Sequence, residues 1–273
     1  MTPFAEGALL RAARGAPAVD VDALAAGGVL VFAPHPDDET LGCGAALAGA
    51  VAAGHAVRVV AATDGGGSHL GSIRWSPERT GAHRARELAA ALDVLGSGRI
   101  RHERLGCRDR GVPCTDASAG RCVIERLVAR VLEERPAYLW TTWEGDPHVD
   151  HRRCAALARA VVREAGEGGH APMLIRFPVW GRFVEIAPVG SNGDALHDSE
   201  GEHAATSAID PDEELVRFSP DSTLKGLKRR ALACHATQMT TLIDDDPDGF
   251  VMPAAMQTHF VEHDELFLRP RAA

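Results

Sequence analysis

The sequence has few aromatic residues and no excess of positive charge. Aromatic residues make up 5% of the 273 residues, and 38 acidic side chains against 29 Lys and Arg give a formal net charge of −9. Negative charge repels a phosphate backbone, and the sequence has no basic stripe with interleaved aromatics. These features argue against nucleic acid as a partner.

Long apolar runs are also absent. No run approaches the roughly 20 apolar residues that a membrane helix needs. Glu6, Arg11 and Arg14 interrupt the segment that the apolar core of a secretory signal would occupy. We therefore expect a cytoplasmic protein without a membrane segment.

The cysteines show no CxxC pair and no zinc-ribbon spacing. In a chain of this length, we expect them to be reduced and buried as small apolar side chains. The short spacing of three of them keeps a disulfide open as an alternative: Cys107, Cys114 and Cys122.

The order of apolar segments predicts the fold class. From Gly28 onward, short apolar runs alternate with stretches of helical periodicity, which is typical of a parallel sheet covered on both faces. The expected strands are 29–33, 55–63, 100–105, 137–143 and 174–180, and the expected helices are 41–54, 76–95, 121–134, 152–164 and 222–235. We expect one α/β domain over residues 1–273, with a Rossmann-like, mostly parallel sheet and helices on both faces.

Three segments lie outside this alternation. Residues 1–27 form an N-terminal extension, and 184–211 is rich in Gly, Ser, Asp and Ala. A structureless segment of that length is either a lid over a binding site or a surface insertion. Within the C-terminal region, an acidic turn is expected at 244–249.

An acidic hexapeptide, 34–39, follows the first expected strand directly. It reads Pro34-His35-Pro36-Asp37-Asp38-Glu39. Ligands of open α/β sheets bind outside the carboxyl ends of the strands, where this segment lies. Three adjacent carboxylates repel one another unless a cation or solvent relieves them. The acids could instead cap the next helix, but capping does not explain the histidine, so we favour a divalent metal.

A second polar segment follows the fourth expected strand. Asp146 and Pro147 are typical of a helix start, with Asp as N-cap and proline in the first turn. His148 and His151 then lie three residues apart on one helix face. Both rings would point toward the sheet edge that holds the hexapeptide. Histidine and aspartate ligands with an open fourth position are typical of catalytic zinc.

A glycine pair offers an alternative of another class. Gly42 and Gly44 resemble the start of a dinucleotide-binding fingerprint. However, the hexapeptide occupies the strand-to-helix turn, and Leu47 replaces the third glycine. Acids in front of a pyrophosphate would repel it, so a nucleotide-binding module ranks below a metal site.

These motifs resemble those of the LmbE/PIG-L family of zinc-dependent N-acetylglucosaminyl deacetylases. The family's (P/A)HPDDE motif stands at 34–39 and its HxDH box at 148–151. Further matches are Thr63-Asp64-Gly65, Arg84-x-x-Glu87, Leu105-Gly106-x-x-Asp109 and Lys228-x-x-Ala231-Leu232-x-Cys234-His235-x-Thr237-Gln238.

The resemblance implies roles for the polar residues. His35, Asp38 and His151 would ligate one Zn²⁺ per chain, and Asp37 would be the general base. Zinc lowers the pKa of a bound water to roughly 7, so that a nearby carboxylate can take its proton. His148 would donate a hydrogen bond to the developing oxyanion.

The resemblance also implies residues that bind the sugar or orient the ligands. Asp64, Arg84 and Asp109 are the candidates for substrate binding. Alternatively, Asp64 and Asp109 serve turns, and Arg84 pairs with Glu87 on a helix surface. Three more residues are candidates for orienting the histidines from behind: Asp146, Asp150 and His235.

The family resemblance implies a small glycoconjugate that carries N-acetylglucosamine (GlcNAc) as the partner. The polar segment 184–211, with Trp180 and Phe183 beside it, favours a bulky aglycone. The overall resemblance implies a deacetylase for a glycopeptide antibiotic intermediate of the teicoplanin type. The alternatives are a GlcNAc-inositol or GlcNAc-malate deacetylase of thiol biosynthesis, and an inactive carbohydrate-binding protein.

Overall fold

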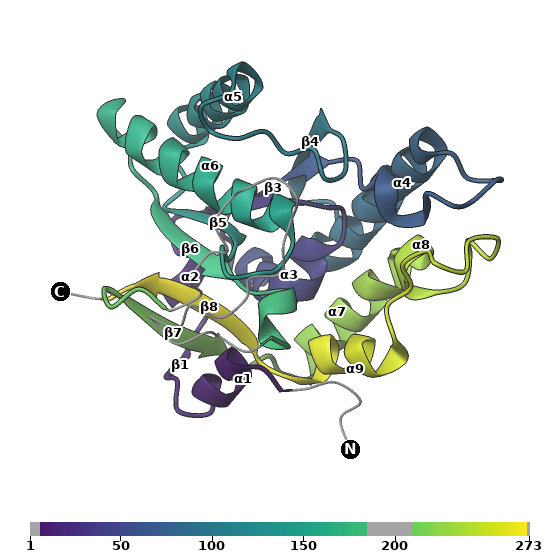
Figure 1. Cartoon of the computed structure of the whole chain (residues 1–273). Coiled ribbons are helices and arrows are strands. Elements are labelled where there is room, and N and C mark those ends of the chain that lie inside the picture. The colour runs from purple at the N-terminus through teal and green to yellow at the C-terminus, as the bar shows by residue number, and fades with distance from the viewer. Residues whose placement is uncertain (1–5, 185–208, 272–273) are drawn as a thin grey trace, which may run out of the picture.

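The computed structural model describes residues 6–184 and 209–271. Eight strands form one sheet in the order β1-β7-β8-β6-β5-β2-β3-β4 (Figure 1). Neighbours from β6 to β4 pair in parallel, and β8 is antiparallel to both β6 and β7. The strands are β1 Ala18–Val19, β2 Val29–Ala33, β3 Val57–Thr63, β4 Arg101–Cys107, β5 Tyr138–Thr142, β6 Met173–Phe177, β7 Glu213–Phe218 and β8 Glu265–Pro270.

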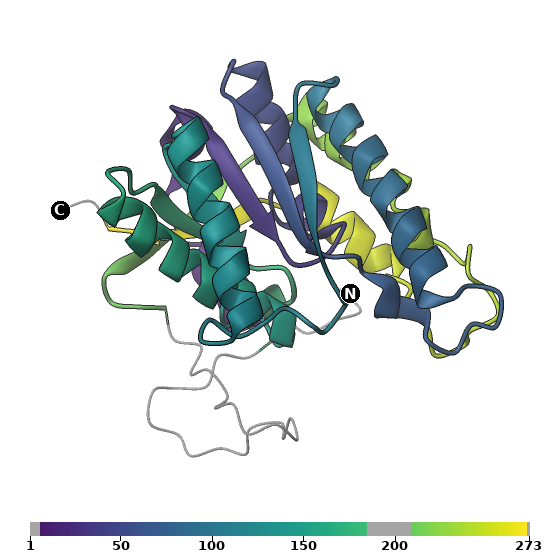
Figure 2. The ribbon, with the colours of Figure 1, turned by 90° about the horizontal axis from the view of Figure 1, so that it is seen from above.

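Helices cover both faces of this sheet. α5 and α6 lie on one face, and α3, α4 and α7 lie on the other (Figure 2). The helices are α1 Ala8–Ala13, α2 Asp22–Ala25, α3 Asp38–Ala52, α4 Pro77–Gly96, α5 Ser118–Glu134, α6 Val149–Glu167, α7 Ser222–Cys234, α8 Ala236–Met239 and α9 Ala254–Glu262, with short 3₁₀ helices η1 Gly66–His69 and η2 Trp180–Arg182. The expected α/β class with a mostly parallel sheet is confirmed.

The central strand β2 shows why the sheet needs both layers. Leu30 and Phe32 pack with α5 and α6, whereas Val29, Val31 and Ala33 pack with α3 and α4. Successive side chains of a strand point to opposite faces. A strand that is apolar at every position is therefore buried on both sides, as its sequence predicts.

Some element bounds differ from the expectations. β6 ends at Phe177, not at Trp180, because Pro178 cannot donate to a ladder. α3 begins at Asp38, so the acidic motif lies partly inside the helix. The N-terminal extension contributes β1, which pairs with β7. The segment 184–211 falls almost entirely on 185–208, outside the described residues.

Two further expectations concern cysteine and membranes. All six cysteines lie in the described part of the chain, and all are free thiols, as expected. The expected burial holds only for Cys43 and Cys154, because Cys122 is exposed and the other three are partly exposed. Among the described helices, none has the length and apolar character to cross a bilayer.

A buried ion pair supplies hydrogen-bond partners at a break in α3. The helix is non-helical at Cys43, with φ −144° and ψ 18°. Beyond the break, Glu265 accepts hydrogen bonds from the amides of Ala45 and Ala46, both at 2.8 Å. Lys228 Nζ donates to the carbonyl of Leu41 at 2.8 Å and to Glu265 Oε1 at 2.6 Å. The pair thus satisfies backbone groups that the break leaves without helical partners.

Of the two glycines beside the break, Gly42 is required by packing, whereas Gly44 has room for a Cβ. A Cβ on Gly42 would lie 2.2 Å from the Phe177 ring, and one on Gly44 would contact Lys228 at 3.6 Å. Both glycines lie inside α3, one turn or more beyond the strand-to-helix turn that a dinucleotide fingerprint would occupy. This placement removes the main support for the nucleotide-binding alternative.

Loss of one partner of the buried pair is expected to be costly. Lys228→Met leaves the Glu265 carboxylate buried without its cation, and urea denaturation should show a loss of about 3–5 kcal/mol in the free energy of unfolding. The matched control is Lys225→Met, because Lys225 is partly exposed and bonds the carbonyl of Glu262. Its loss should stay below about 1 kcal/mol. Equal losses in the two variants would contradict this account.

Candidate active site

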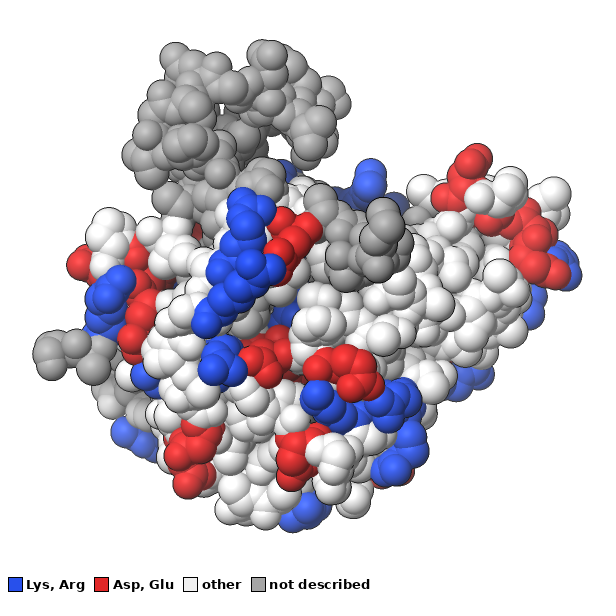
Figure 3. Space-filling model, turned by 90° about the horizontal axis from the view of Figure 1, so that it is seen from below, with Lys and Arg blue, Asp and Glu red and all other residues white. Residues whose placement is uncertain are grey.

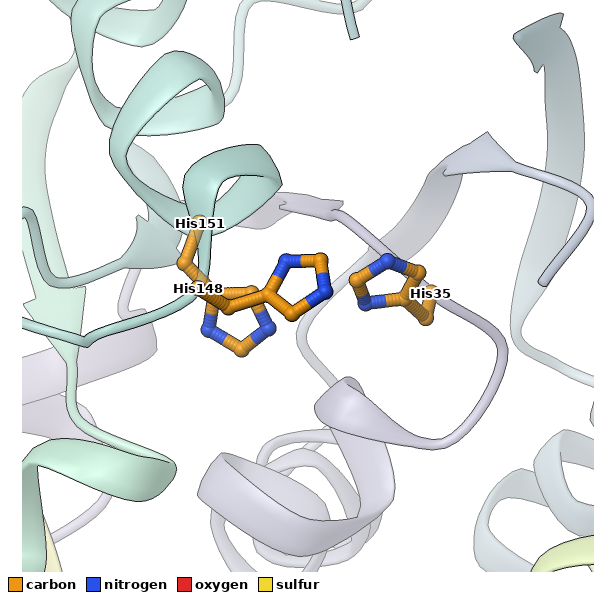
Figure 4. Close-up of side chains that lie close together, drawn as sticks. All are labelled: His35, His148 and His151. Carbon is orange, nitrogen blue, oxygen red and sulfur yellow. The ribbon is translucent and has the colours of Figure 1, made fainter. Parts of the chain in front are cut away.

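The candidate site lies where the sheet's connections diverge. β2 and β5 are adjacent and parallel, and their next strands lie on opposite sides of the pair. Open α/β sheets bind ligands at such a switch point. His35, Asp37 and Asp38 follow β2, and His148 and His151 follow β5. Figure 4 shows the three histidine rings facing one another from these two segments.

One carboxylate oxygen links the two segments. Asp38 Oδ2 lies 3.0 Å from His35 Nδ1 and 3.3 Å from His151 Nε2. These side chains are buried, with Asp38 and His151 no more than 2% exposed. Two overlapping groups place possible ligand atoms within 4.8 Å of one another: His35, His148 and His151, and His35, Asp109, His148 and Asp150. Neither group contains Asp38, but its contacts with His35 and His151 bring the three residues that we expected to ligate a metal close together.

Asp146 orients the ring of His151. Its Oδ2 lies 2.7 Å from His151 Nδ1. The same carboxylate accepts hydrogen bonds from the amides of Val179 at 3.0 Å and Gly181 at 2.6 Å. His151 Nε2 therefore faces Asp38, and it is buried without a hydrogen-bond partner among the described residues. A carboxylate behind a histidine in this way is typical of metal sites.

The helix start after β5 differs from the expectation. Asp146 and Pro147 do not begin α6. The helix begins at Val149 with His148 as the N-cap, and His148 Nδ1 accepts the Asp150 amide hydrogen at 3.2 Å. Instead of capping a helix, the Asp146 carboxylate accepts hydrogen bonds from the amides of Val179 and Gly181, in the loop after β6.

The protonation of His148 follows from this cap. Because Nδ1 accepts a hydrogen bond, the neutral ring carries its proton on Nε2. Burial lowers the pKa of His148 to about 4, with further lowering from His35 and His151. His148 is therefore a neutral N–H donor at the edge of the cavity.

Two carboxylates hold the other nitrogen of His35. Its Nε2 lies 3.1 Å from Asp150 Oδ2 and 3.3 Å from Asp109 Oδ1. Asp150 also accepts the amides of Arg110 at 2.6 Å and Val112 at 3.1 Å. Burial works to lower the pKa of His35, but hydrogen bonds to Asp109 and Asp150 outweigh it and leave the pKa well above its usual value.

The charges of the cluster favour a cation at this point. Burial would lower the pKa of His151, but the Asp38 charge and the Asp146 hydrogen bond raise it to about 9. Burial would raise the pKa of Asp38, yet His151 holds it well below its usual value. Imidazole nitrogen and carboxylate oxygen are the donors that zinc and similar divalent ions prefer. The donor set fits such an ion, and so does His151 Nε2, which is buried beside Asp38 Oδ2 without a hydrogen bond to the described parts of the chain.

Asp37 occupies a strained backbone conformation. Its φ of 142° is rare for a residue with a side chain. Arg84 holds the loop, with Nη2 3.1 Å from Asp37 Oδ2 and hydrogen bonds of 2.8 Å to the carbonyls of Pro36 and Gly65. Glu39 accepts the Asp37 amide at 3.1 Å. Burial raises the pKa of Asp37 to about 7, although Arg84 opposes the shift.

Sequence reasoning missed the function of Glu39 and assigned Arg84 to the substrate. Arg84 is 3% exposed, and the bonds above direct its guanidinium to the loop of Asp37. This geometry makes Arg84 and Glu39 positioning residues for Asp37. Substrate binding by Arg84, whose side chain lines the cavity, stays a prediction.

The remaining expected residues lie around this cluster. Asp109 lines the cavity and accepts the Gly67 amide at 3.0 Å. Asp64 accepts the Gly66 amide at 2.9 Å, which supports the turn interpretation. His235 is buried, and its Nε2 lies 3.2 Å from Thr40 Oγ1 at the start of α3. Burial lowers the pKa of His235 to about 3, so it supports the motif as a neutral ring.

A cavity of about 750 Å³ opens from the cluster. Its inner end contains His35, Asp37, Asp38 and His148. Its outer part is lined by Ser68, Leu70, Gly71, Arg110, Trp180, Gln238, Asp246, Asp248 and Phe250. Of these residues, the sequence had pointed only to Trp180 as part of an aglycone-binding region.

Comparison with known proteins identifies the family. The model described as "PIG-L: GlcNAc-PI de-N-acetylase" matches residues 30–162. A 1D-myo-inositol 2-acetamido-2-deoxy-alpha-D-glucopyranoside deacetylase from a Nocardioides species is 31% identical over 259 residues, covering 78% of this chain and 83% of the relative. The protein of the same name from Kineococcus radiotolerans is 29% identical over 259 residues, and the match covers 79% of this chain and 70% of that relative. The chain belongs to the PIG-L family of de-N-acetylases.

A solved structure of a deacetylase–teicoplanin complex shares the fold. Its TM-score is 0.58 at 17% sequence identity, and the match covers 90% of this chain and 99% of that chain. Identity at this level shows the fold alone. The likeness to this structure therefore does not confirm the glycopeptide antibiotic substrate that we placed first.

The strain at Asp37 predicts an unusual order of stability. In urea denaturation, the free energy of unfolding of Asp37→Gly should exceed that of Asp37→Ala by about 1 kcal/mol or more. The reason is that glycine adopts a φ of 142° without steric cost. At Asp93, exposed on α4, the alanine variant should be the more stable of the pair. An alanine variant at position 37 as stable as the glycine variant would show that the loop relaxes and stores no strain.

Proposed function

We propose that this protein removes the acetyl group from GlcNAc linked to inositol, with zinc held by His35, Asp38 and His151. The proposal rests above all on Nε2 of His151, which is buried without a hydrogen-bond partner among the described residues and lies 3.3 Å from Asp38 Oδ2. The family membership supports a de-N-acetylase, and the names of the sequence relatives support the inositol conjugate.

The bound zinc would supply a water with a pKa near 7 and polarise the acetamide carbonyl. Asp37 lines the cavity next to Asp38, and Arg84 fixes its carboxylate. Asp37 would take the proton of the attacking water while the oxygen of that water bonds to the acetamide carbon. When the C–N bond breaks, the proton passes to the leaving nitrogen, so the products are acetate and the free amine.

His148 would stabilise the charge that forms on the carbonyl oxygen. The α6 amide of Asp150 holds Nδ1 of His148 and leaves the Nε2 hydrogen free to donate. A preorganised donor of this kind stabilises the transition state more than the ground state.

A substrate panel tests the proposed activity. We expect acetate release from GlcNAc-inositol with a higher kcat/KM than from GlcNAc-malate or a teicoplanin-type GlcNAc pseudoaglycone. A chelator should abolish acetate release, and added Zn²⁺ should restore it. The proposal fails if the pseudoaglycone is the best substrate, or if the chelated protein keeps its activity.

The general base has its own test. Asp37→Asn keeps the shape of the side chain but cannot take a proton, so kcat should fall by about 10²- to 10⁴-fold. Zinc content measured by elemental analysis should be unchanged. Asp93→Asn on the exposed surface of α4 is the control and should keep the wild-type rate. If Asp37→Asn retains more than about a tenth of kcat, another group is the base.

A further inference from the structure

Two loops form the outer wall of the cavity. The first, 66–76, follows β3, and the second, 240–250, follows α8; they project side by side at one end of the molecule (Figures 1 and 2). Asp245 accepts the amides of Ile73 at 3.1 Å and Arg74 at 3.0 Å. Asp246 Oδ2 accepts the Gly71 amide at 2.8 Å. We call residues 244–250 the acidic loop.

The acidic loop places carboxylates in the cavity wall. Asp246 and Asp248 both line the cavity, and the Asp248 amide donates to Asp246 Oδ1 at 3.2 Å. The exposed Asp244 pairs instead with Arg74 on the outer surface. In Figure 3 acidic and basic atoms meet at the end of the molecule where the loops project. The apolar part of the wall is the edge-to-face pair of Trp180 and Phe250, 5.7 Å apart.

A buried amide adds a further acceptor. Gln238 is 2% exposed and lines the cavity. Its Nε2 donates to Ser68 Oγ and Thr237 Oγ1, both at 3.1 Å. The Thr237 hydroxyl itself donates to Glu87, which fixes the orientation of the amide. The backbone carbonyl of Gln238 accepts the Met252 amide at 2.8 Å, whereas the side-chain bonds found among the described residues are both donated by Nε2. The side-chain oxygen can therefore act as an acceptor at this part of the cavity lining.

The wall therefore offers acceptors to whatever is attached to the sugar. Carboxylates and an amide oxygen bind hydroxyl groups, which donate. A phosphate or carboxylate brings only acceptors and like charge to Asp246 and Asp248. Arg110 is the exposed cation of the cavity and lies on the loop after β4, whereas Arg84 is already paired with Asp37.

We propose that the acidic loop makes this enzyme select a neutral polyol as the aglycone and discriminate against anionic ones. The proposal rests on the GlcNAc deacetylase function proposed above and specifies its substrate class. It predicts that GlcNAc-inositol is preferred over GlcNAc-malate and over inositol conjugates that carry phosphate. Asp248 is the residue that determines the charge selectivity, because Asp246 is also engaged with the backbone of Gly71.

Substitutions at Asp248 test this selectivity. The measured quantity is the ratio of kcat/KM for GlcNAc-inositol to that for GlcNAc-malate, with zinc-loaded protein. Asp248→Asn keeps an acceptor and removes the charge, so the ratio should fall about 3- to 10-fold. Asp248→Lys should lower the ratio further. Raising the salt concentration should lower the wild-type ratio and leave that of Asp248→Asn nearly unchanged.

Matched variants separate this account from its competitors. Asp244→Asn removes a charge from the same loop but on the outer surface, and it should keep the wild-type ratio. Thermal melting checks that each variant is folded. An unchanged ratio in a folded Asp248→Asn overturns the proposal. The proposal is also overturned if the wild-type enzyme prefers GlcNAc-malate and Arg110→Ala abolishes that preference, because Arg110 would then bind the anion.

Failure of the selectivity and failure of the function give different results. If zinc-loaded protein releases no acetate from either conjugate, the deacetylase function on these substrates is wrong. If acetate is released but Asp248 does not alter the ratio, the deacetylase function stands and the role of the acidic loop is wrong.

Discussion

The account depends on one carboxylate that two histidines share across the sheet. Asp38 Oδ2 lies against His35 and His151, which belong to segments more than 100 residues apart. Their meeting requires β2 and β5 to be parallel neighbours with diverging connections. Asp146 then turns the free nitrogen of His151 toward Asp38. The fold and the chemistry are linked at this contact, because neither segment could form the cluster alone.

The rest of the structure holds this contact in place at some cost in strain. Arg84 and Glu39 keep Asp37 in a backbone conformation that few side chains adopt. Below the motif, α3 is broken, and the buried pair of Lys228 and Glu265 satisfies the backbone groups at the break. Strain at active sites persists where the surrounding structure over-determines it. The last third of the chain thus supports the motif at its start.

Much of the fold and of the cluster could be predicted from the sequence because the signals are local. An apolar run such as β2 predicts a buried strand, and the polar motif directly after it marks the carboxyl end of that strand, where ligands bind. The family resemblance predicted that Asp146 orients a histidine, but the residues alone also allowed it to start a helix. Its bonds to the amides of Val179 and Gly181 could not be predicted, because those amides lie in a distant loop. The acidic loop was visible as a turn, but its contacts with Gly71 span 175 residues. Contacts of that separation depend on the completed fold.

The central claim is that His35, Asp38 and His151 share one divalent ion. Anomalous diffraction at the zinc absorption edge, from crystals of protein purified without chelator, tests it most directly. The account predicts a single peak per chain within bonding distance of these three side chains. A peak held instead by His35, Asp109, His148 and Asp150, the second group of possible ligands, would contradict it.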